Sequence, residues 1–241
     1  MRGFWTLFEK DVRLSLPWFF TNVAIVSLFV GLSVFYVKRG NNVGLLFLFL
    51  AGAGLFLWSI FAGIATYFNE RDGRLYEFVN SLPVNRTVIL LSKEVWLILQ
   101  ATLYFAILVV GGYLVMKISG SLSIFNVRGI EDLARTSIVA KGILAQYLRI
   151  LTFLTSGIVS AALVKDLPLR WFFAVLMVML ISWAVGWLDL TPFLGVKGTV
   201  PGDPNQILRV VNLQLLNESL RFLATFLLLL LGGVWVERRG Y

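Results

Sequence analysis

Long apolar stretches separated by short polar segments are the dominant pattern of this sequence. A helix of roughly 20 apolar residues crosses a bilayer core about 30 Å thick. Five stretches reach that length and a sixth is expected, so we place the spans at residues 17–37, 43–68, 95–116, 143–164, 171–190 and 217–236. Helices satisfy their own backbone hydrogen bonds in lipid, and no stretch alternates like the strands of a barrel. The pattern predicts an all-α integral membrane protein with six transmembrane helices, in which residues 1–241 form a single transmembrane domain.

The segment ahead of the first span combines charged and aromatic residues. Glu9, Lys10, Asp11 and Arg13 alternate with apolar side chains such as Phe8. The apolar run that follows is longer than the core of a signal peptide, and no small-residue cleavage site comes after it. We expect an N-terminal amphipathic helix that lies in the membrane interface, rather than a cleaved leader or a frayed polar terminus.

Segment 69–94, between the second and third spans, is longer than a plain connection requires. Some of its apolar residues recur at i, i+3, i+4 and i+7, and they would form one face of a short helix: Leu75, Phe78, Val79 and Leu82. Pro83 would end this helix, and Asn85 or Thr87 would cap the next one. The extra length indicates a docking element, although the same pattern also fits a helix that only anchors the loop in the interface.

The remaining polar segments are expected on the opposite side of the membrane from segment 69–94. Residues 117–147 would contain an amphipathic helix that leads into the fourth span, and residues 191–206, rich in Gly and Pro, would form an irregular loop. Residues 207–216 would be helical and lie near the interface. In the second span, the small residues 51–54 permit close helix contact, either between subunits or within the chain.

Arg149 is a charge whose depth depends on where the fourth span begins. If the span begins near Ile138, Arg149 lies inside the membrane, which costs roughly 2.5–3.5 kcal/mol, requires a partner and suggests a transport path. If it begins near Leu148, Arg149 lies at the interface with its guanidinium group in water. We expect the second position and keep the first as a candidate intramembrane charge.

The composition narrows the function classes. Hydrophobic residues make up 59% of the chain and charged residues 14%, against roughly 45–50% and about 25% in soluble domains. Because the chain has neither His nor Cys, disulfides, Cys/His zinc sites and Ser-His or Cys-His catalytic pairs are excluded. There is no phosphate-binding loop motif, and the acidic residues are scattered. We therefore predict no catalytic, cofactor-binding or metal-binding residues, and assign the net charge of +8 to loops beside anionic lipid rather than to nucleic-acid binding.

Two short motifs in the long loop carry a resemblance to a known family. Residues 67–78 read Tyr-Phe-Asn-Glu-Arg-Asp-Gly-Arg-Leu-Tyr-Glu-Phe, and residues 81–86 read Ser-Leu-Pro-Val-Asn-Arg. Together they resemble the loop after the second span of ABC-2 type transporter permeases. These permeases have the architecture of type V ABC exporters. Lys93 matches a lysine common at the start of the family's third span, whereas Asn85 stands where serine is common. The interfacial N-terminal helix, the six spans and the structured region before the sixth span agree with this layout.

The resemblance implies a permease subunit that catalyses nothing and moves a substrate, by export, with energy from a separate cytoplasmic ABC ATPase. Two such six-span permeases, as a homodimer or heterodimer, would pair with two ATPase copies, and ATP would bind only to the partner. The loop would be a cytoplasmic coupling helix whose contacts are Asn69, Glu70, Arg71, Asp72, Gly73, Arg74, Glu77, Leu82, Pro83 and Arg86. Both termini would be cytoplasmic and the protein would lie in the cell membrane; the Lys and Arg residues, split eleven to nine without Arg149, slightly favour this orientation.

Two other functions fit part of the pattern. One is a permease of haem or copper assembly, against which the absence of His and Cys argues. The other is a membrane scaffold or assembly factor that transports nothing and binds no ATPase. The long loop with its family motif favours the ATPase-driven permease over both.

Overall fold

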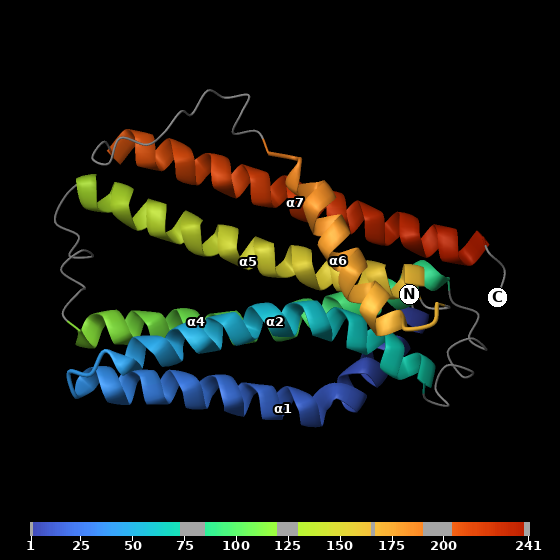
Figure 1. Cartoon of the computed structure of the whole chain (residues 1–241), viewed down its shortest axis with the longest axis horizontal. Helices are drawn as coiled ribbons and strands as arrows, with labels where there is room; N and C mark the ends of the chain where they lie inside the picture. The colour runs from blue at the N-terminus through green and yellow to red at the C-terminus, as the bar shows by residue number, and fades with distance from the viewer. Residues whose placement is uncertain (1, 73–84, 120–129, 165–166, 190–203, 239–241) are drawn as a thin grey trace.

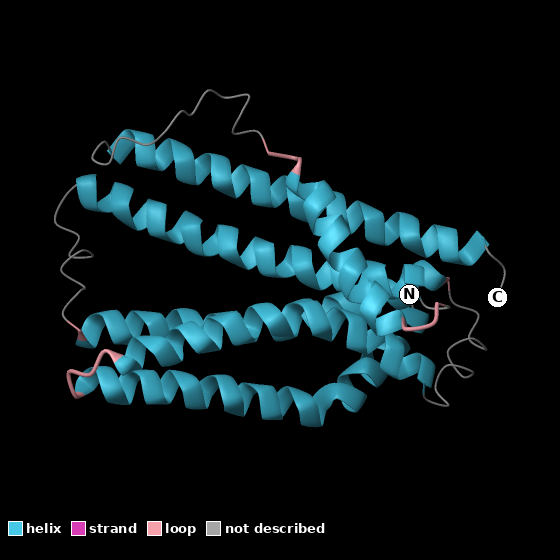
Figure 2. Ribbon diagram, viewed as in Figure 1, coloured by secondary structure: helices cyan, strands magenta, loops and turns pink. Residues whose placement is uncertain are grey.

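The computed structural model describes residues 2–72, 85–119, 130–164, 167–189 and 204–238. Six helices make up almost all of this part of the chain, and no strand is found in it (Figure 2). They are α1 (Arg2–Lys38), α2 (Val43–Asp72), α4 (Arg86–Ile118), α5 (Ile130–Val164), α6 (Arg170–Gly186) and α7 (Pro204–Arg238). Five of them, all but α6, are long and apolar enough to cross a membrane. The predicted all-α membrane architecture is confirmed, whereas the count of six spans stays a prediction because α6 has only 17 residues.

The helices extend beyond the predicted spans, and two predicted interfacial helices are continuous with a span. The N-terminal amphipathic segment is the first part of α1, which runs unbroken from Arg2 to Lys38 with Pro17 inside it. A proline inside a helix removes one hydrogen bond and kinks the helix, and the ribbon of α1 changes direction near its N-terminal end (Figure 1). Residues 207–216 likewise belong to α7. Both segments are helical, as predicted, and each is continuous with the helix that follows it; their position in the membrane interface stays a prediction.

The fourth and fifth predicted spans also differ from the helices observed. Helix α5 begins at Ile130 rather than at 143, and its apolar span covers Ser137–Val164. Helix α6 ends at Gly186 rather than at 190. The membrane boundaries along these helices stay predictions.

Helix α5 is the centre of the bundle. It packs against α7, α2, α6 and α4, and 72% of its most apolar window is buried, against 6% for α1. Helix α1 lies at one edge, where it contacts α4 and α2 (Figure 1). Much of the outer surface is apolar, with side chains such as Trp18, Phe49 and Trp183 exposed. Because a water-soluble protein seldom exposes a large apolar surface, this one faces lipid, and the chain is a multi-pass membrane protein.

Close approach of α2 and α5 depends on two glycines. A Cβ atom on Gly63 would lie 2.5 Å from the carbonyl oxygen of Leu154, and one on Gly157 would lie 2.8 Å from that of Ile60. The predicted small-residue run shows no such contact, because a Cβ on Gly52 or Gly54 would meet nothing within 4 Å. Glycines therefore do set the contact between α2 and α5, but at positions outside residues 51–54.

Candidate functional site

One end of the bundle brings together the two helices that flank the predicted coupling loop. Helix α2 ends there at Asp72 and α4 begins there at Arg86, beside the end of α5 and the start of α6. The start of α1 and the end of α7 lie at the same end (Figure 1). We call it the α2–α4 end, and the opposite end, where α1 connects to α2, the α1–α2 end. Both ends of the described chain therefore lie on the side of the predicted coupling loop.

The predicted coupling residues fall into three groups in the structure. The backbones of four of them form the last turn of α2, with side chains outside the described residues: Asn69, Glu70, Arg71 and Asp72. Five lie wholly outside the described residues: Gly73, Arg74, Glu77, Leu82 and Pro83. Arg86 is the first residue of α4, with a half-buried side chain. The structure thus fixes where the loop leaves α2 and where it enters α4.

The entry into α4 is capped by the loop's last residue. The Asn85 side-chain oxygen accepts a hydrogen bond from the backbone N–H of Thr87 at 2.8 Å. Of the two residues expected to cap this helix, Asn85 does so. A capped start contributes about 1 kcal/mol and fixes the direction in which the chain enters the helix.

The exit from α2 is held by an aromatic contact with α6. Phe68 is fully buried, and its ring lies edge-on to Trp171 with the centroids 5.2 Å apart. The Arg170 guanidinium carbon lies 5.0 Å from the centre of the same ring. A cation over an aromatic face contributes about 0.5–1 kcal/mol or more. The last turn of α2, which carries the predicted contact residues, therefore follows directly on a residue, Phe68, that is held in place by α6.

The start of α4 is tied to α1 by a buried ion pair. The Lys93 ammonium lies 3.5 Å from Asp11 Oδ1, and the Ser92 hydroxyl donates to Asp11 Oδ2 at 3.1 Å. Lys10 lies 3.4 Å from the same carboxylate. Lys93 and Asp11 are both buried, and buried charges persist only when paired. Leu7 and Ile89 pack beside this cluster and add an apolar contact between the same two helices.

The next residue along α4 points to a different helix. Glu94 is fully buried and accepts a hydrogen bond from the Thr155 hydroxyl of α5. Consecutive residues of one helical turn therefore join α4 to both α1 and α5. A displacement of the start of α4 would be carried to both neighbours, since breaking either contact leaves a buried polar group without its hydrogen-bond or ion-pair partner.

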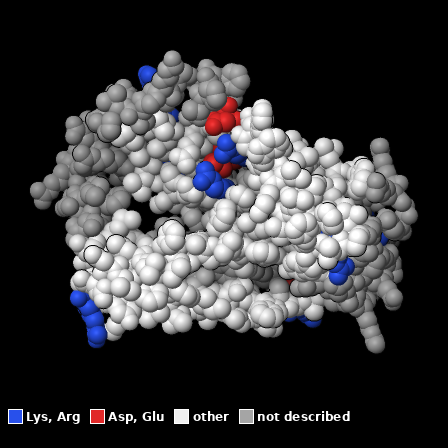
Figure 3. All heavy atoms as spheres, in the orientation of Figure 1, with Lys and Arg blue, Asp and Glu red and all other residues white. Residues whose placement is uncertain are grey.

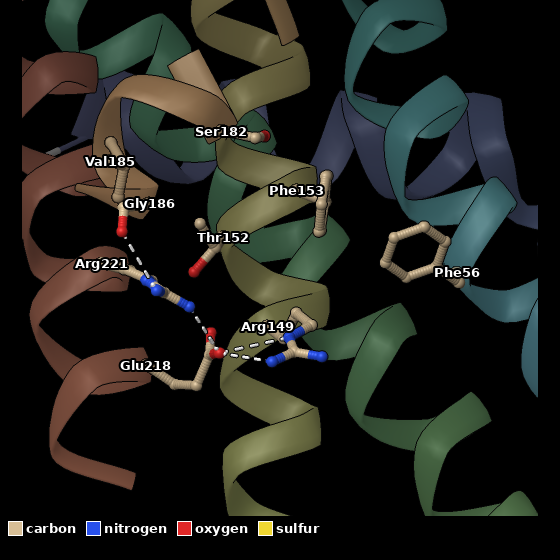
Figure 4. Close-up of a pocket in the computed structure, with 9 residues that line it drawn as sticks. All are labelled: Phe56, Arg149, Thr152, Phe153, Ser182, Val185, Gly186, Glu218 and Arg221. Atoms are coloured by element: carbon tan, nitrogen blue, oxygen red, sulfur yellow. Dashed lines mark hydrogen bonds and ion pairs between the residues drawn. The ribbon is translucent and has the colours of Figure 1, made fainter. Parts of the chain in front are cut away.

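A second group of charges lies where α5, α6 and α7 meet. Glu218 Oε1 accepts hydrogen bonds from Arg149 Nη2 at 2.7 Å and from Arg221 Nη1 at 3.0 Å. Arg221 Nη2 also donates to the carbonyl oxygen of Gly186, at the end of α6, at 3.2 Å. The close-up shows the two guanidinium groups on either side of the carboxylate (Figure 4). Two cations thus share one anion, which leaves the group with one excess positive charge.

The charged residues of this group lie far from the ends of α5 and α7, although the end of α6 lies beside them. Arg149 is near the middle of the candidate span Ser137–Val164, and Arg221 is near the middle of Ile207–Trp235. The expected interfacial position of Arg149 required a span that begins near Leu148, whereas the apolar helix extends well beyond it on both sides. Arg149 therefore has the partner that the intramembrane alternative requires, Glu218, and its depth in the membrane stays a prediction.

A cavity of about 310 Å³ adjoins these charges. Part of its wall is polar and is formed by the charged residues together with Thr152 and Ser182. The rest is apolar and is formed by the rings of Phe56 and Phe153 and the side chain of Val185. In the space-filling view, basic and acidic side chains gather in a hollow, and the described residues that border it are mostly uncharged (Figure 3). The hollow offers a polar contact within an otherwise apolar surface.

Most of these buried polar residues were not predicted from the sequence. Asp11 was placed in an interfacial helix, and Glu94 and Glu218 were counted only among acidic residues scattered along the chain. A signal for Glu218 existed, because it precedes Arg221 by three positions inside an apolar stretch, which is the spacing of a helical ion pair. No comparable signal linked Asp11 to Lys93, since these residues are far apart in the chain.

Comparison with known proteins identifies the family. The family model described as "ABC-2 family transporter protein" matches residues 6–139, which is more than half of the chain. No curated protein and no solved structure matches it. The matched region covers α1, α2, α4 and the start of α5, including the whole predicted coupling segment. The chain therefore belongs to the ABC-2 family of transporter proteins.

Proposed function

We propose that this chain is the membrane-spanning permease subunit of an ATP-driven ABC exporter. A separate cytoplasmic ATPase would bind segment 69–86 and supply the energy. The observation that carries the proposal is the family match over residues 6–139, which includes that segment. The contacts that tie both ends of the segment into the bundle support it, because a docking element must be attached firmly to the helices that it moves.

The contacts suggest how a movement of the ATPase would reach the membrane. A force on the segment acts on α2 beside Phe68 and on α4 at its cap, Asn85. Because α4 is joined to α1 through Lys93 and to α5 through Glu94, these helices would move together as a rigid body. Helix α5 carries Arg149, so the same motion would change the cavity among α5, α6 and α7.

The full pump would contain two such permeases and two ATPases, with ATP bound only by the ATPases. The permease would lie in the cell membrane with both termini in the cytoplasm. The position of the helix ends supports this orientation, since the start of α1 and the end of α7 lie at the α2–α4 end (Figure 1). Charges of segment 69–74 would pair with the ATPase surface and fix the register of the complex.

Exchange of two charges in the segment tests the proposal. The E70K/R71E variant keeps the net charge but reverses the sign of the charge at each of the two positions. The ATPase should therefore no longer co-purify in mild detergent, and ATP-dependent transport should be lost. The matched control is K117E/E131K, which exchanges charges between the last turn of α4 and the first turn of α5. The control should retain the ATPase. Unchanged ATPase binding and transport in E70K/R71E would refute the proposal, and absence of any ATPase would favour the scaffold or assembly-factor alternative.

A further inference from the structure

We propose that the cavity among α5, α6 and α7 binds the anionic head group of an amphiphilic molecule, with Arg149, Arg221 and Ser182 as the polar contacts. This inference deepens the proposed function, because it assigns a substrate class to the permease. Nothing in the family match specifies a substrate. The charge balance, the unpartnered donors and the shape of the site support this assignment.

The charge balance favours an anion. Arg149 and Arg221 share the single carboxylate of Glu218, and the side chain of Glu218 is only 3% exposed. The charged side chains that line the cavity therefore keep one excess positive charge in the middle of two candidate spans, and Asp189, which is outside the lining, accepts a hydrogen bond from Asn217. Uncompensated charge is costly at that depth, so a bound anion would lower the free energy of the site. Among the described residues lining the cavity, no second carboxylate is available for this role.

Two polar groups of the site lack a hydrogen-bond partner among the described residues. They are Arg221 Nε and the hydroxyl of Ser182, and both atoms are buried. Both residues line the 310 Å³ cavity. Buried polar atoms are nearly always hydrogen-bonded, and an exception requires an explanation such as a missing ligand. An anionic group in the cavity could accept from these donors through different oxygens, as phosphate and carboxylate groups do from arginine.

The other walls of the site suit an apolar chain. Phe56 and Phe153 face the charged group across the cavity (Figure 4), with their ring centroids 4.6 Å apart. Phe56 and Arg149 also line a second cavity of about 240 Å³, whose other walls include Leu55, Phe105 and Leu108. The charged group is therefore bordered by apolar space on the side away from α7. A small inorganic anion would leave this apolar space empty. An amphiphile would place its head group beside the charged residues and its apolar chain in this space.

Photolabelling of the purified permease tests this site without an ATPase. The protein is placed in phosphatidylcholine nanodiscs and exposed to an alkyl phosphate that carries a diazirine in its chain. The matched alcohol and trimethylammonium compounds serve as neutral and cationic probes. We expect the phosphate to label peptides of α5, α6 and α7 in preference to both. Equal labelling by the three head groups would overturn the proposal.

Paired variants separate binding from a structural role. R221Q should lower the preference for the phosphate by about tenfold or more, the size of one lost charge-assisted hydrogen bond. E218Q should raise it, because both arginines then lack their internal anion. S182A, a small change that keeps the charges, should lower it by about two- to tenfold. If R221Q and E218Q both weaken labelling, or neither changes it, the residues are only structural and the proposal fails.

A matched control and a competition complete the experiment. K141Q removes a cation that also joins α5 to α7, through Asn212, but does not line the cavity, so labelling should persist. Displacement by phosphatidylglycerol would identify a membrane lipid as the occupant, and displacement only by a soluble short-chain alkyl phosphate would identify a solute. Failure of both to displace the probe would overturn specific binding. Selective labelling in a chain that binds no ATPase would refute the proposed function and leave the site standing.

Discussion

The contact between α2 and α5 makes a sharp prediction about two glycines of one helix. Replacement of Gly63 by alanine puts a methyl group 2.5 Å from the Leu154 carbonyl oxygen, 3.0 Å from the Ile158 nitrogen and 3.1 Å from the Gly157 Cα. All three are backbone atoms, so no side-chain rotation relieves the overlap. The helices must separate by about 1 Å to reach ordinary van der Waals distance. Replacement of Gly52 on the same helix meets nothing within 4 Å.

The size of the effect follows from two opposing terms. Overpacking of a well-packed interior costs about 1–3 kcal/mol, and a gap of 0.5–1 Å forfeits a quarter to a half of each dispersion contact. Alanine is favoured over glycine in a helix by about 1 kcal/mol. Gly52→Ala should therefore stabilise the protein slightly. Gly63→Ala should be less stable than Gly52→Ala by about 1–3 kcal/mol. This difference is the cost of overpacking, because the gain in helix propensity is the same in both variants.

Reversible unfolding by sodium dodecyl sulfate in mixed micelles measures this difference. The free energy of unfolding is extrapolated to zero denaturing detergent for the natural chain and for both variants. Two glycine-to-alanine changes on one helix share the same propensity term, so their difference isolates the contact with α5. If Gly63→Ala is as stable as Gly52→Ala, the close approach of α2 and α5 is refuted.

Three further predictions concern the polar contacts and the orientation. Asp11→Asn should destabilise the protein by about 3–5 kcal/mol in the same unfolding assay, because it removes the anion of a buried ion pair. The double change D11L/K93M should recover most of that loss, and equal losses of stability in both variants would contradict the pairing. Asn85→Ala should cost about 0.5–2 kcal/mol through loss of the helix cap, and an unchanged stability would refute the cap. Because the chain has no cysteine, R39C and R86C can each be labelled singly. A membrane-impermeant maleimide should label R39C in intact cells and R86C only after permeabilisation. The reverse pattern would contradict cytoplasmic termini.

The apolar pattern was sufficient to predict the helices themselves. Each of the six predicted spans overlaps one of the six helices of the described residues, because a run of about 20 apolar residues has little alternative in lipid. The cap at Asn85 was also among the two predicted, since its side chain precedes the apolar run at the right spacing.

Helix ends were harder to predict, because hydropathy marks where a helix enters lipid and says little about where it stops. The first predicted span began at residue 17, yet α1 begins at Arg2 and continues through Pro17. The sixth predicted span began at residue 217, yet α7 is continuous from Pro204. In both cases the change from polar to apolar residues reflects a change of surroundings along one helix.

The buried charges could not be predicted from local patterns. Asp11 and Lys93 meet only because α1 and α4 pack side by side, and Arg149 meets Glu218 only because α5 and α7 do. A charge near the edge of an apolar run has the same local sequence whether it faces water or a partner on another helix. Knowledge of which helices are neighbours was required to decide.

Site-specific cross-linking tests the ATPase-driven permease most directly. The cysteine-free chain allows single cysteines at Arg71 and Arg86, in the segment proposed to bind the ATPase, and at Arg39, at the α1–α2 end. Each is coupled to a benzophenone maleimide in membranes of the native host, irradiated and analysed by mass spectrometry. We expect an ABC ATPase adduct from the first two positions and none from Arg39. No ATPase adduct from either position of the segment, with the permease labelled and folded, would contradict this expectation.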